Sequence, residues 1–229
     1  LAYNETVASY MSSIRLRMDA ASFFPELTNN NMRGYLGDKA TDIKSWAIPN
    51  GYLNRLTKSE ATKVDYLNAY GGYLDFQGDE MLFMGLYDFT ITTPPIPAGT
   101  YEIRFGYSPT GGRGVAEVYV DSVPVDAPID FSISATNPEI SYVVPGSDAN
   151  DPYGYENDKV MRNHGYMKGP ASYKDVLGIW YGKSIARNSR QVLRKVLGTF
   201  SFNTAGRHNI SVKALKVGQF QLDYIEFVP

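Results

Sequence analysis

The sequence predicts a mainly β protein: an antiparallel β-sandwich of jelly-roll type, galactose-binding-like, with a short N-terminal helical segment. Apolar and polar residues alternate along several segments, which is the pattern of strands with one buried face. The 229 residues include 21 Gly and 13 Pro, and 14% are aromatic. Glycine and proline favour turns, and aromatic residues are enriched in strands. Many short strands separated by such turns are typical of a sandwich.

The N-terminal segment has a helical pattern instead. Apolar side chains recur at the three- and four-residue spacing of one helix face over residues 4–20, and Asn4 can cap the start. We therefore interpret residues 1–32 as an N-terminal helical segment, which could be the tail of a preceding domain. Residues 33–229 form the predicted β-sandwich domain.

The clearest strand covers residues 101–107, where apolar side chains at odd positions alternate with polar residues or glycine. An apolar, aromatic run precedes it and ends at a Pro-rich stretch, because proline cannot donate to a central ladder. Further strands are predicted over residues 115–120, 192–202, 210–215 and 220–228.

Residues 146–190 have a different composition, with many Gly, Asn and Tyr. We expect a long loop excursion there, with a short helix near residues 173–177. Loops of this length inside a compact domain are usually functional. The sequence therefore predicts a binding site in this excursion.

The composition excludes several classes of function. The chain has no Cys, so a disulfide-stapled fold and a thiolate metal site are excluded. A net charge of −2 and a pI near 5.7 exclude a bulk electrostatic nucleic-acid binder. No run of 18 apolar residues is present, so we expect no transmembrane segment. The sequence has neither a G-x-S-x-G elbow nor a His-x-x-x-His pair, and we predict that it is not an enzyme. A glycan-active enzyme is the lesser alternative, because two of the 24 Asp and Glu residues could lie at glycosidase separation.

Charge is distributed unevenly along the chain. Residues 114–158 hold nine acids and no Lys or Arg, whereas residues 158–215 hold eleven Lys or Arg and two acids. One interpretation is that the two segments are neighbours that neutralise each other. The other is a basic surface for an anionic glycan or a cell-surface polyanion.

The predicted ligand-binding residues lie in the excursion. Trp180 and Tyr181, together with Tyr155, offer aromatic faces on which a sugar ring could stack. Arg162 and His164 belong to a loop that mixes cation, amide and aromatic groups, which suits polar ligands. The alternatives are that these aromatic rings are core residues and that Arg162 and His164 only pin the loop.

Asp223 is the main metal candidate. Strand parity places it on the same side as Ile225 and Phe227, and a carboxylate among inward apolar residues needs a cation or several hydrogen bonds. Pairing of Asp223 with Arg or with backbone N–H groups is an equal alternative. The oxygen-rich stretch 148–151 is a weaker calcium candidate, because the later positions of the EF-hand pattern are not met.

Two resemblances add to these predictions. The ending FQLDYIEFVP (220–229), the strand PAGTYEIRF (97–105) and VAEVYVD (115–121) resemble strands of galactose-binding-like modules, including carbohydrate-binding modules of the family 6 and 35 type. An acid in the last strand of those modules often helps to hold a structural calcium ion. The resemblance implies that role for Asp223, with Glu80, Asp75 or Asp79 as partner; we select Glu80. We expect no cofactor besides this ion.

The chain also resembles the C-terminal region of Bacteroidetes-type fasciclin-domain surface lipoproteins. The stretches that carry this resemblance are RLRMD (15–19), FPEL (24–27), QGDE (77–80), ENDK (156–159) and MRNHGYMK (161–168). The resemblance implies export, a lipid anchor on a segment before Leu1, and a place at the cell surface, on the extracellular side of the outer membrane. Because the chain begins at Leu1 without a leader, we interpret it as a mature or trimmed fragment.

The sequence therefore predicts a non-catalytic, extracellular carbohydrate-binding module of a cell-surface protein. The alternative is a cell-adhesion or structural module that binds a cell-surface protein or packs against a preceding fasciclin domain. The first should expose an aromatic ring beside polar groups in a cleft. The second should expose an apolar patch.

Overall fold

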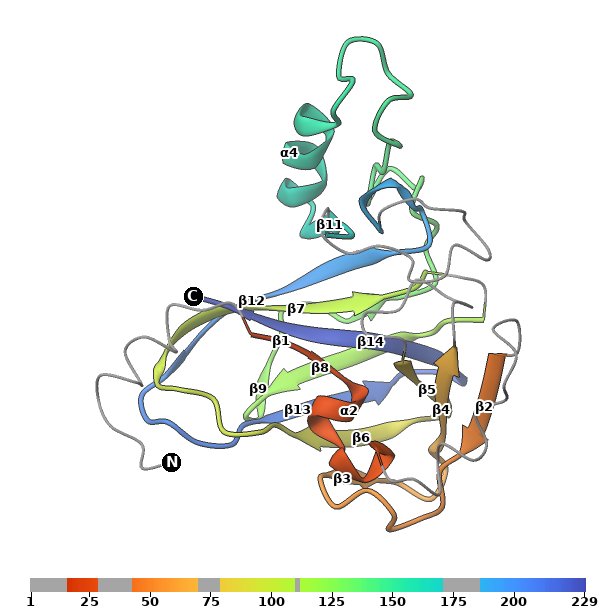
Figure 1. Ribbon diagram of the computed structural model, residues 1–229, viewed down its shortest axis with the longest axis vertical. Coiled ribbons are helices and arrows are strands. Elements are labelled where there is room, and N and C mark those ends of the chain that lie inside the picture. Colours follow the sequence, from red (N-terminus) through yellow and green to blue (C-terminus); the bar gives the residue numbers. More distant parts are fainter. Residues whose placement is uncertain (1–15, 29–42, 70–78, 110–111, 171–185) are drawn as a thin grey trace.

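The computed structural model describes residues 16–28, 43–69, 79–109, 112–170 and 186–229 (Figure 1). These residues form two antiparallel sheets in two layers, with a helix and a short strand projecting beyond one edge. In the described part of the chain, no helix is both long and apolar enough to cross a membrane.

The elements follow one another along the chain in an order dominated by strands. Their bounds are β1 Leu16–Asp19, α2 Ala20–Phe23, η1 Pro25–Thr28, β2 Ile43–Ala47, β3 Leu56–Lys58, β4 Lys63–Ala69, β5 Asp79–Gly85, β6 Asp88–Thr92, β7 Gly99–Tyr107, β8 Val115–Val120, β9 Val123–Pro124, β10 Ile129–Asp130, α4 Tyr155–Asn163, β11 Tyr166–Lys168, η2 Ala186–Asn188, β12 Leu193–Phe202, β13 Asn209–Ala214 and β14 Gly218–Val228.

The first sheet, sheet A, has the strand order β11-β12-β7-β14-β5-β4-β2 among the described residues, and β1 also pairs with β14. The second, sheet B, has the order β10-β8-β13-β6-β3, with β9 beside β8. Strands that are distant in sequence are thus neighbours, as with β7, which lies between β12 and β14. This arrangement places the last strand at the centre of sheet A.

Aromatic side chains fill the space between the sheets. Phe83 of β5 and Phe89 of β6 stack with ring centroids 3.6 Å apart, which joins sheet A to sheet B. Phe220 of β14 packs against both of them and against Phe105 and Phe131. Large aromatic rings contribute most of the buried apolar area in such a core.

The predicted fold class, an antiparallel β-sandwich with a short N-terminal helical segment, is confirmed. The strands predicted from apolar patterning correspond closely to β7, β8, β12, β13 and β14.

The helix predicted over residues 4–20 is wrong at its C-terminal end, because Leu16–Asp19 form β1 and pair with β14. The helical segment falls instead at α2 and η1, whose Phe23, Phe24 and Leu27 are buried in the core. The prediction failed there because a sheet edge with open hydrogen-bonding groups outweighs local helical spacing.

The excursion over 146–190 also differs from the prediction. It contains α4 and the edge strand β11, which pairs with β12 and so belongs to sheet A. The short helix predicted near 173–177 lies outside the described residues. The excursion therefore begins as an ordered extension of sheet A, with α4 above its edge (Figure 1).

Candidate functional site

Helix α4 is fixed at its start by one carboxylate. Asp151 Oδ1 accepts a hydrogen bond from the backbone N–H of Tyr155 at 2.8 Å, and Oδ2 accepts one from Asn157 at 2.9 Å. These bonds to backbone N–H groups lower the pKa of Asp151. Asp151, which the sequence suggested as part of an oxygen-rich calcium loop, is thus used to cap a helix.

A groove lies between α4, β11, β12 and η2. Its volume is about 360 Å³, within the range of small-ligand sites. Five of its described lining residues are cations and one is an acid; the lining consists of Asp158, Lys159, Arg162, Met167, Lys168, Arg187 and Arg194. The groove is therefore strongly cationic.

Lys168 lies at the inner side of this groove with a fully buried side chain. Its Nζ donates to Asn157 Oδ1 at 2.5 Å and to Asp158 Oδ1 at 2.9 Å. Desolvation lowers the pKa of Lys168, and Asp158 partly offsets this effect. Arg187 binds the other oxygen of Asp158 at 2.6 Å, so both carboxylate oxygens of Asp158 are occupied by cations.

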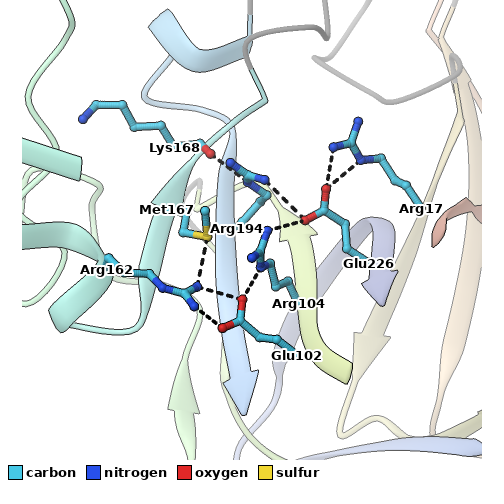
Figure 2. A network of polar contacts seen from close by, with 8 residues as sticks. All are labelled: Arg17, Glu102, Arg104, Arg162, Met167, Lys168, Arg194 and Glu226. Carbon is cyan, nitrogen blue, oxygen red and sulfur yellow. Dashed lines mark hydrogen bonds and ion pairs between the residues drawn. The ribbon is translucent and has the colours of Figure 1, made fainter. Parts of the chain in front are cut away.

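Behind the groove, the outer face of sheet A carries a network centred on Glu226 (Figure 2). Glu226 is fully buried and forms ion pairs with Arg17 at 2.6 Å and with Arg104 and Arg194 at 3.3 Å each. Desolvation raises the pKa of this carboxyl, but the three arginines outweigh it and hold the pKa below its ordinary value. Glu226 therefore stays ionised inside the protein.

Glu102 connects this network to α4. It accepts from Arg104 at 2.5 Å, and its two oxygens bind the guanidinium of Arg162, which reaches over from the helix (Figure 2). Burial raises the pKa of Glu102, and the two arginines more than compensate, leaving it below its usual range. This bidentate pair ties the projecting helix to β7 and fixes one wall of the groove.

Two exposed tyrosines stand next to the groove. Tyr153 and Tyr155 are 68% and 63% exposed, and their rings stack with centroids 5.7 Å apart. The guanidinium of Arg187, which lines the groove, lies 5.9 Å from the centre of the Tyr155 ring and donates to the backbone oxygen of Tyr153. The structure thus places an exposed aromatic surface directly beside polar, charged groups.

The predicted ligand-binding residues fall in three places. Arg162 lines the groove, and Tyr155 belongs to the aromatic pair beside it. His164 caps the end of α4 with an exposed side chain and is not part of the lining. Trp180 and Tyr181 lie outside the described residues. Sequence reasoning missed Lys168, Arg187 and Arg194, for which the basic bias of residues 158–215 was the available signal.

The predicted metal ligands are both buried. Asp223 is 6% exposed and lies at a bulge in β14, where the pairing with β7 shifts between Leu222 and Tyr224. Glu80 Oε1 has no hydrogen-bond partner within the described part of the chain, and burial raises the pKa of Glu80 to about 7, against the smaller effects of Gln221 and Arg113.

Calcium binds six to eight oxygen ligands. Among the residues that the structure describes, no three His, Cys, Asp or Glu side chains gather in a way that could hold an ion. The carboxylates of Glu80 and Asp223 therefore do not by themselves make a calcium site. Of the other two candidate partners, Asp79 begins β5 and Asp75 lies outside the described residues, so the calcium ion stays a prediction.

Comparisons with known proteins find only distant structural likenesses. The chain matches no protein-family model and no curated protein. It is similar in structure to a xanthan lyase from Paenibacillus (8% identity, TM-score 0.39, 82% of this chain and 12% of that one) and to an exo-β-1,3-galactanase from Phanerochaete chrysosporium (10%, 0.37, 81% and 29%). An insecticidal crystal protein is equally similar (16%, 0.36, 82% and 22%). The chain spans less than a third of each of these proteins, and at such scores the likeness carries no argument about function.

Proposed function

We propose that this chain is a non-catalytic carbohydrate-binding module and that its binding surface is the groove beside α4 together with Tyr153 and Tyr155. The observation that carries this proposal is the contact of Arg187 with both parts, since it lines the groove and lies beside the Tyr155 ring. A sugar presents an apolar C–H face and a rim of hydroxyls. Exposed rings next to guanidinium and ammonium donors match both.

The small number of carboxylates in the groove supports sugar binding rather than sugar hydrolysis. Glycoside hydrolysis generally needs two carboxyl groups across the scissile bond, one of them a proton donor. The described lining supplies Asp158 alone, and both of its oxygens are bound by cations. Asp158 is therefore engaged by structural ion pairs on both of its oxygens.

The proposal includes the location. We place the module on the extracellular side of the cell surface, attached through a lipid anchor on a segment before Leu1, as the resemblance to fasciclin-domain lipoproteins implies. The motifs around ENDK and MRNHGYMK, which carry that resemblance, are the residues that form α4, β11 and one wall of the groove.

The test is a glycan-array screen of the folded chain, with and without calcium, followed by titration of any glycan that binds. Replacing both Tyr153 and Tyr155 by Ala should weaken binding about tenfold or more, because the stacking surface is removed. Tyr119→Ala, on β8 of the other sheet, is the matched control and should bind normally. A folded protein that binds no glycan, or a double variant that binds as well as the wild type, would contradict the proposal.

The same assay tests the two aromatic residues outside the described part. Replacing Trp180 and Tyr181 by Ala should abolish glycan retention and leave unfolding cooperative if they extend the binding surface. Loss of folding would show instead that they are core residues.

A second candidate function, binding of a protein partner, is favoured by a separate observation. Leu86, Leu215 and Val217 are 49%, 50% and 76% exposed. They lie in the turns at one end of the sandwich, which the pairing of Gly85 with Gly218 brings together. Exposed apolar side chains that gather in this way are typical of an adhesion surface. If this is the functional site, Val217→Asp should abolish partner binding and leave glycan binding unchanged.

A further inference from the structure

We propose that the groove selects anionic sugars, and that the group it recognises is a carboxylate or sulfate on the glycan. This inference rests on the proposed carbohydrate-binding function and narrows it to one ligand class. Three observations support it: an excess of cations, their burial, and guanidinium donors that the protein itself leaves available.

The first observation is the charge of the ion-paired cluster around the groove. It contains seven cations and four carboxylates within the described residues. The cations are Arg17, Arg104, Lys159, Arg162, Lys168, Arg187 and Arg194, and the carboxylates are Glu102, Glu156, Asp158 and Glu226. Asp151, the nearby fifth acid, is bonded to helix amides. The cluster therefore keeps a positive excess that internal pairing does not neutralise.

The second observation is that part of this excess is buried. Arg104 and Arg194 are 6% and 8% exposed, and they share Glu226 with Arg17. Desolvation lowers the pKa of Arg194, as it does for Lys168. Cations withdrawn from water are stabilised by an anion placed next to them, and the interaction is stronger there than at an exposed surface. Of these buried cations, Arg194 and Lys168 line the groove, where an anion can reach them.

The third observation is the set of available donors. Arg194 uses Nε on the backbone oxygen of Lys168 and Nη1 on Glu226, which leaves Nη2 without a partner among the described residues. Arg187 uses Nη2 on Asp158 and on the backbone, so its Nε and Nη1 have no partner within the part of the chain that the structure describes. Lys159, 70% exposed at the side chain, adds an ammonium at the rim, where its one ion-pair partner among the described residues is the equally exposed Glu156. Planar guanidinium groups recognise carboxylate and sulfate oxygens with paired hydrogen bonds.

The arrangement also suits a polymer. An acidic sugar in the groove would place its neighbour along the chain toward the rings of Tyr153 and Tyr155, which adjoin Arg187. The charged groove would then bind one sugar, and the two tyrosine rings would stack on the next. Separate sites for the two sugars are consistent with the position of the aromatic pair outside the charged lining.

The experiment titrates the full chain with four polymers: a polyuronate, a sulfated glycan, a neutral polysaccharide and single-stranded DNA. We expect tight binding to one or both acidic glycans, little to the neutral one, and a loss of affinity of about tenfold or more between about 0.05 and 0.5 M salt, as screening increases. The two acidic arms decide whether the recognised group is a carboxylate or a sulfate. DNA is the control for attraction to any polyanion.

Lys159→Glu is the first variant, because its exposed side chain is not needed for folding. It should weaken binding to the acidic glycan about tenfold. Lys213→Glu makes the same charge change at an exposed position on β13 of sheet B and should have little effect. Arg194→Gln is the second variant, and it should reduce binding more than Lys159→Glu does. Thermal unfolding first checks that this variant is folded.

The outcomes separate the inference from the proposed function. Binding of the neutral polysaccharide through Tyr153 and Tyr155, unaffected by Lys159→Glu, would overturn the anionic selectivity and leave carbohydrate binding standing. Equal binding of DNA and acidic glycans would overturn sugar selectivity in favour of a general polyanion surface. Absence of binding to every glycan would overturn both.

Discussion

The two faces of sheet A are both buried along β7 and β14, but one face buries apolar and aromatic side chains and the other buries charged ones. On the inner face, Tyr101, Ile103 and Phe105 of β7 pack with Phe220 and Phe227 of β14. On the outer face, the same strands bury charged groups that are held by one another (Figure 2). The inner face is stabilised by removal of apolar area from water, which needs no particular partner. The outer face is stabilised only while each charge keeps its counter-charge.

Two buried glutamates show how a neighbouring cation changes the pKa of a carboxyl group. Glu226 has three arginines and a lowered pKa, whereas Glu80 is buried without a paired cation among the described residues and has a pKa of about 7. The same side chain, equally withdrawn from water, thus has a lowered pKa in one place and a raised pKa in the other. Burial raises the pKa of both carboxyls, and the three arginines outweigh that effect only at Glu226.

The largest effect is expected on the inner face. Phe220→Ala should lower the free energy of unfolding by about 3–5 kcal/mol, because the ring fills the centre of the aromatic core and its loss leaves a cavity. Urea denaturation measures this. Val217→Ala, at a 76% exposed position near the same strand, is the control and should be nearly neutral. A small effect of Phe220→Ala would mean that the core collapses around the cavity.

Glu226→Gln should have the next largest effect, a loss of about 3 kcal/mol at neutral pH, because three arginines then share no carboxylate. The folded-state pKa of Glu226 is below its ordinary value, so its contribution is full above about 4.5 and is lost as the pH falls through the folded pKa. The difference between variant and wild type should therefore shrink on acidification. Glu156→Gln, which breaks an exposed pair, should leave the unfolding midpoint unchanged, and equal effects of the two variants would contradict the role of burial.

Glu80→Gln should act in the opposite direction and by at most a similar amount. The raised pKa means that ionisation destabilises the fold as the pH rises from about 4.5 to about 7, so the variant should gain at most about 3 kcal/mol above pH 7 and nothing below 4.5. Unfolding curves at several pH values, with chelator and with calcium, measure this. Glu139→Gln, at an exposed site, is the control. If the wild type is instead the more stable protein, and only with calcium, Glu80 is a metal ligand.

Much of the fold could be predicted because the inner face is a local pattern. Alternation along β7 identifies both its inward and its outward residues, and the same holds for β8 and β13. In β12 the alternation is interrupted where the pairing with β7 shifts between Val196 and Gly198. The helical spacing that ends at Met18 failed because it describes a free helix, whereas Leu16–Asp19 complete a ladder beside β14. Strand parity assigned Asp223 to a face on the assumption of a regular repeat. The pairing of β14 with β7 shifts between Leu222 and Tyr224, and such a bulge interrupts the repeat at Asp223.

The groove was predictable in part. The sequence located its segment and selected Arg162 and Tyr155, which lie in or beside it, but it described that segment as loop and did not find α4. Helix α4 has a single buried residue, Met161, so it carries almost no apolar periodicity. Its position depends instead on Asp151 at its start and on the Glu102–Arg162 pair, 60 residues apart in sequence.

The sequence by itself determined the fold class, the strands β7, β8, β12, β13 and β14, and the basic bias of residues 158–215, because apolar patterning and composition are properties of neighbouring residues. The tertiary structure decided which charges meet. Glu226 and Arg17 are 209 residues apart, and Glu226 and Arg104 are 122 apart, yet the order β12-β7-β14, with β1 on the far side of β14, brings them into one buried network. Charge pairing depends on distances through space, and sheet topology sets those distances.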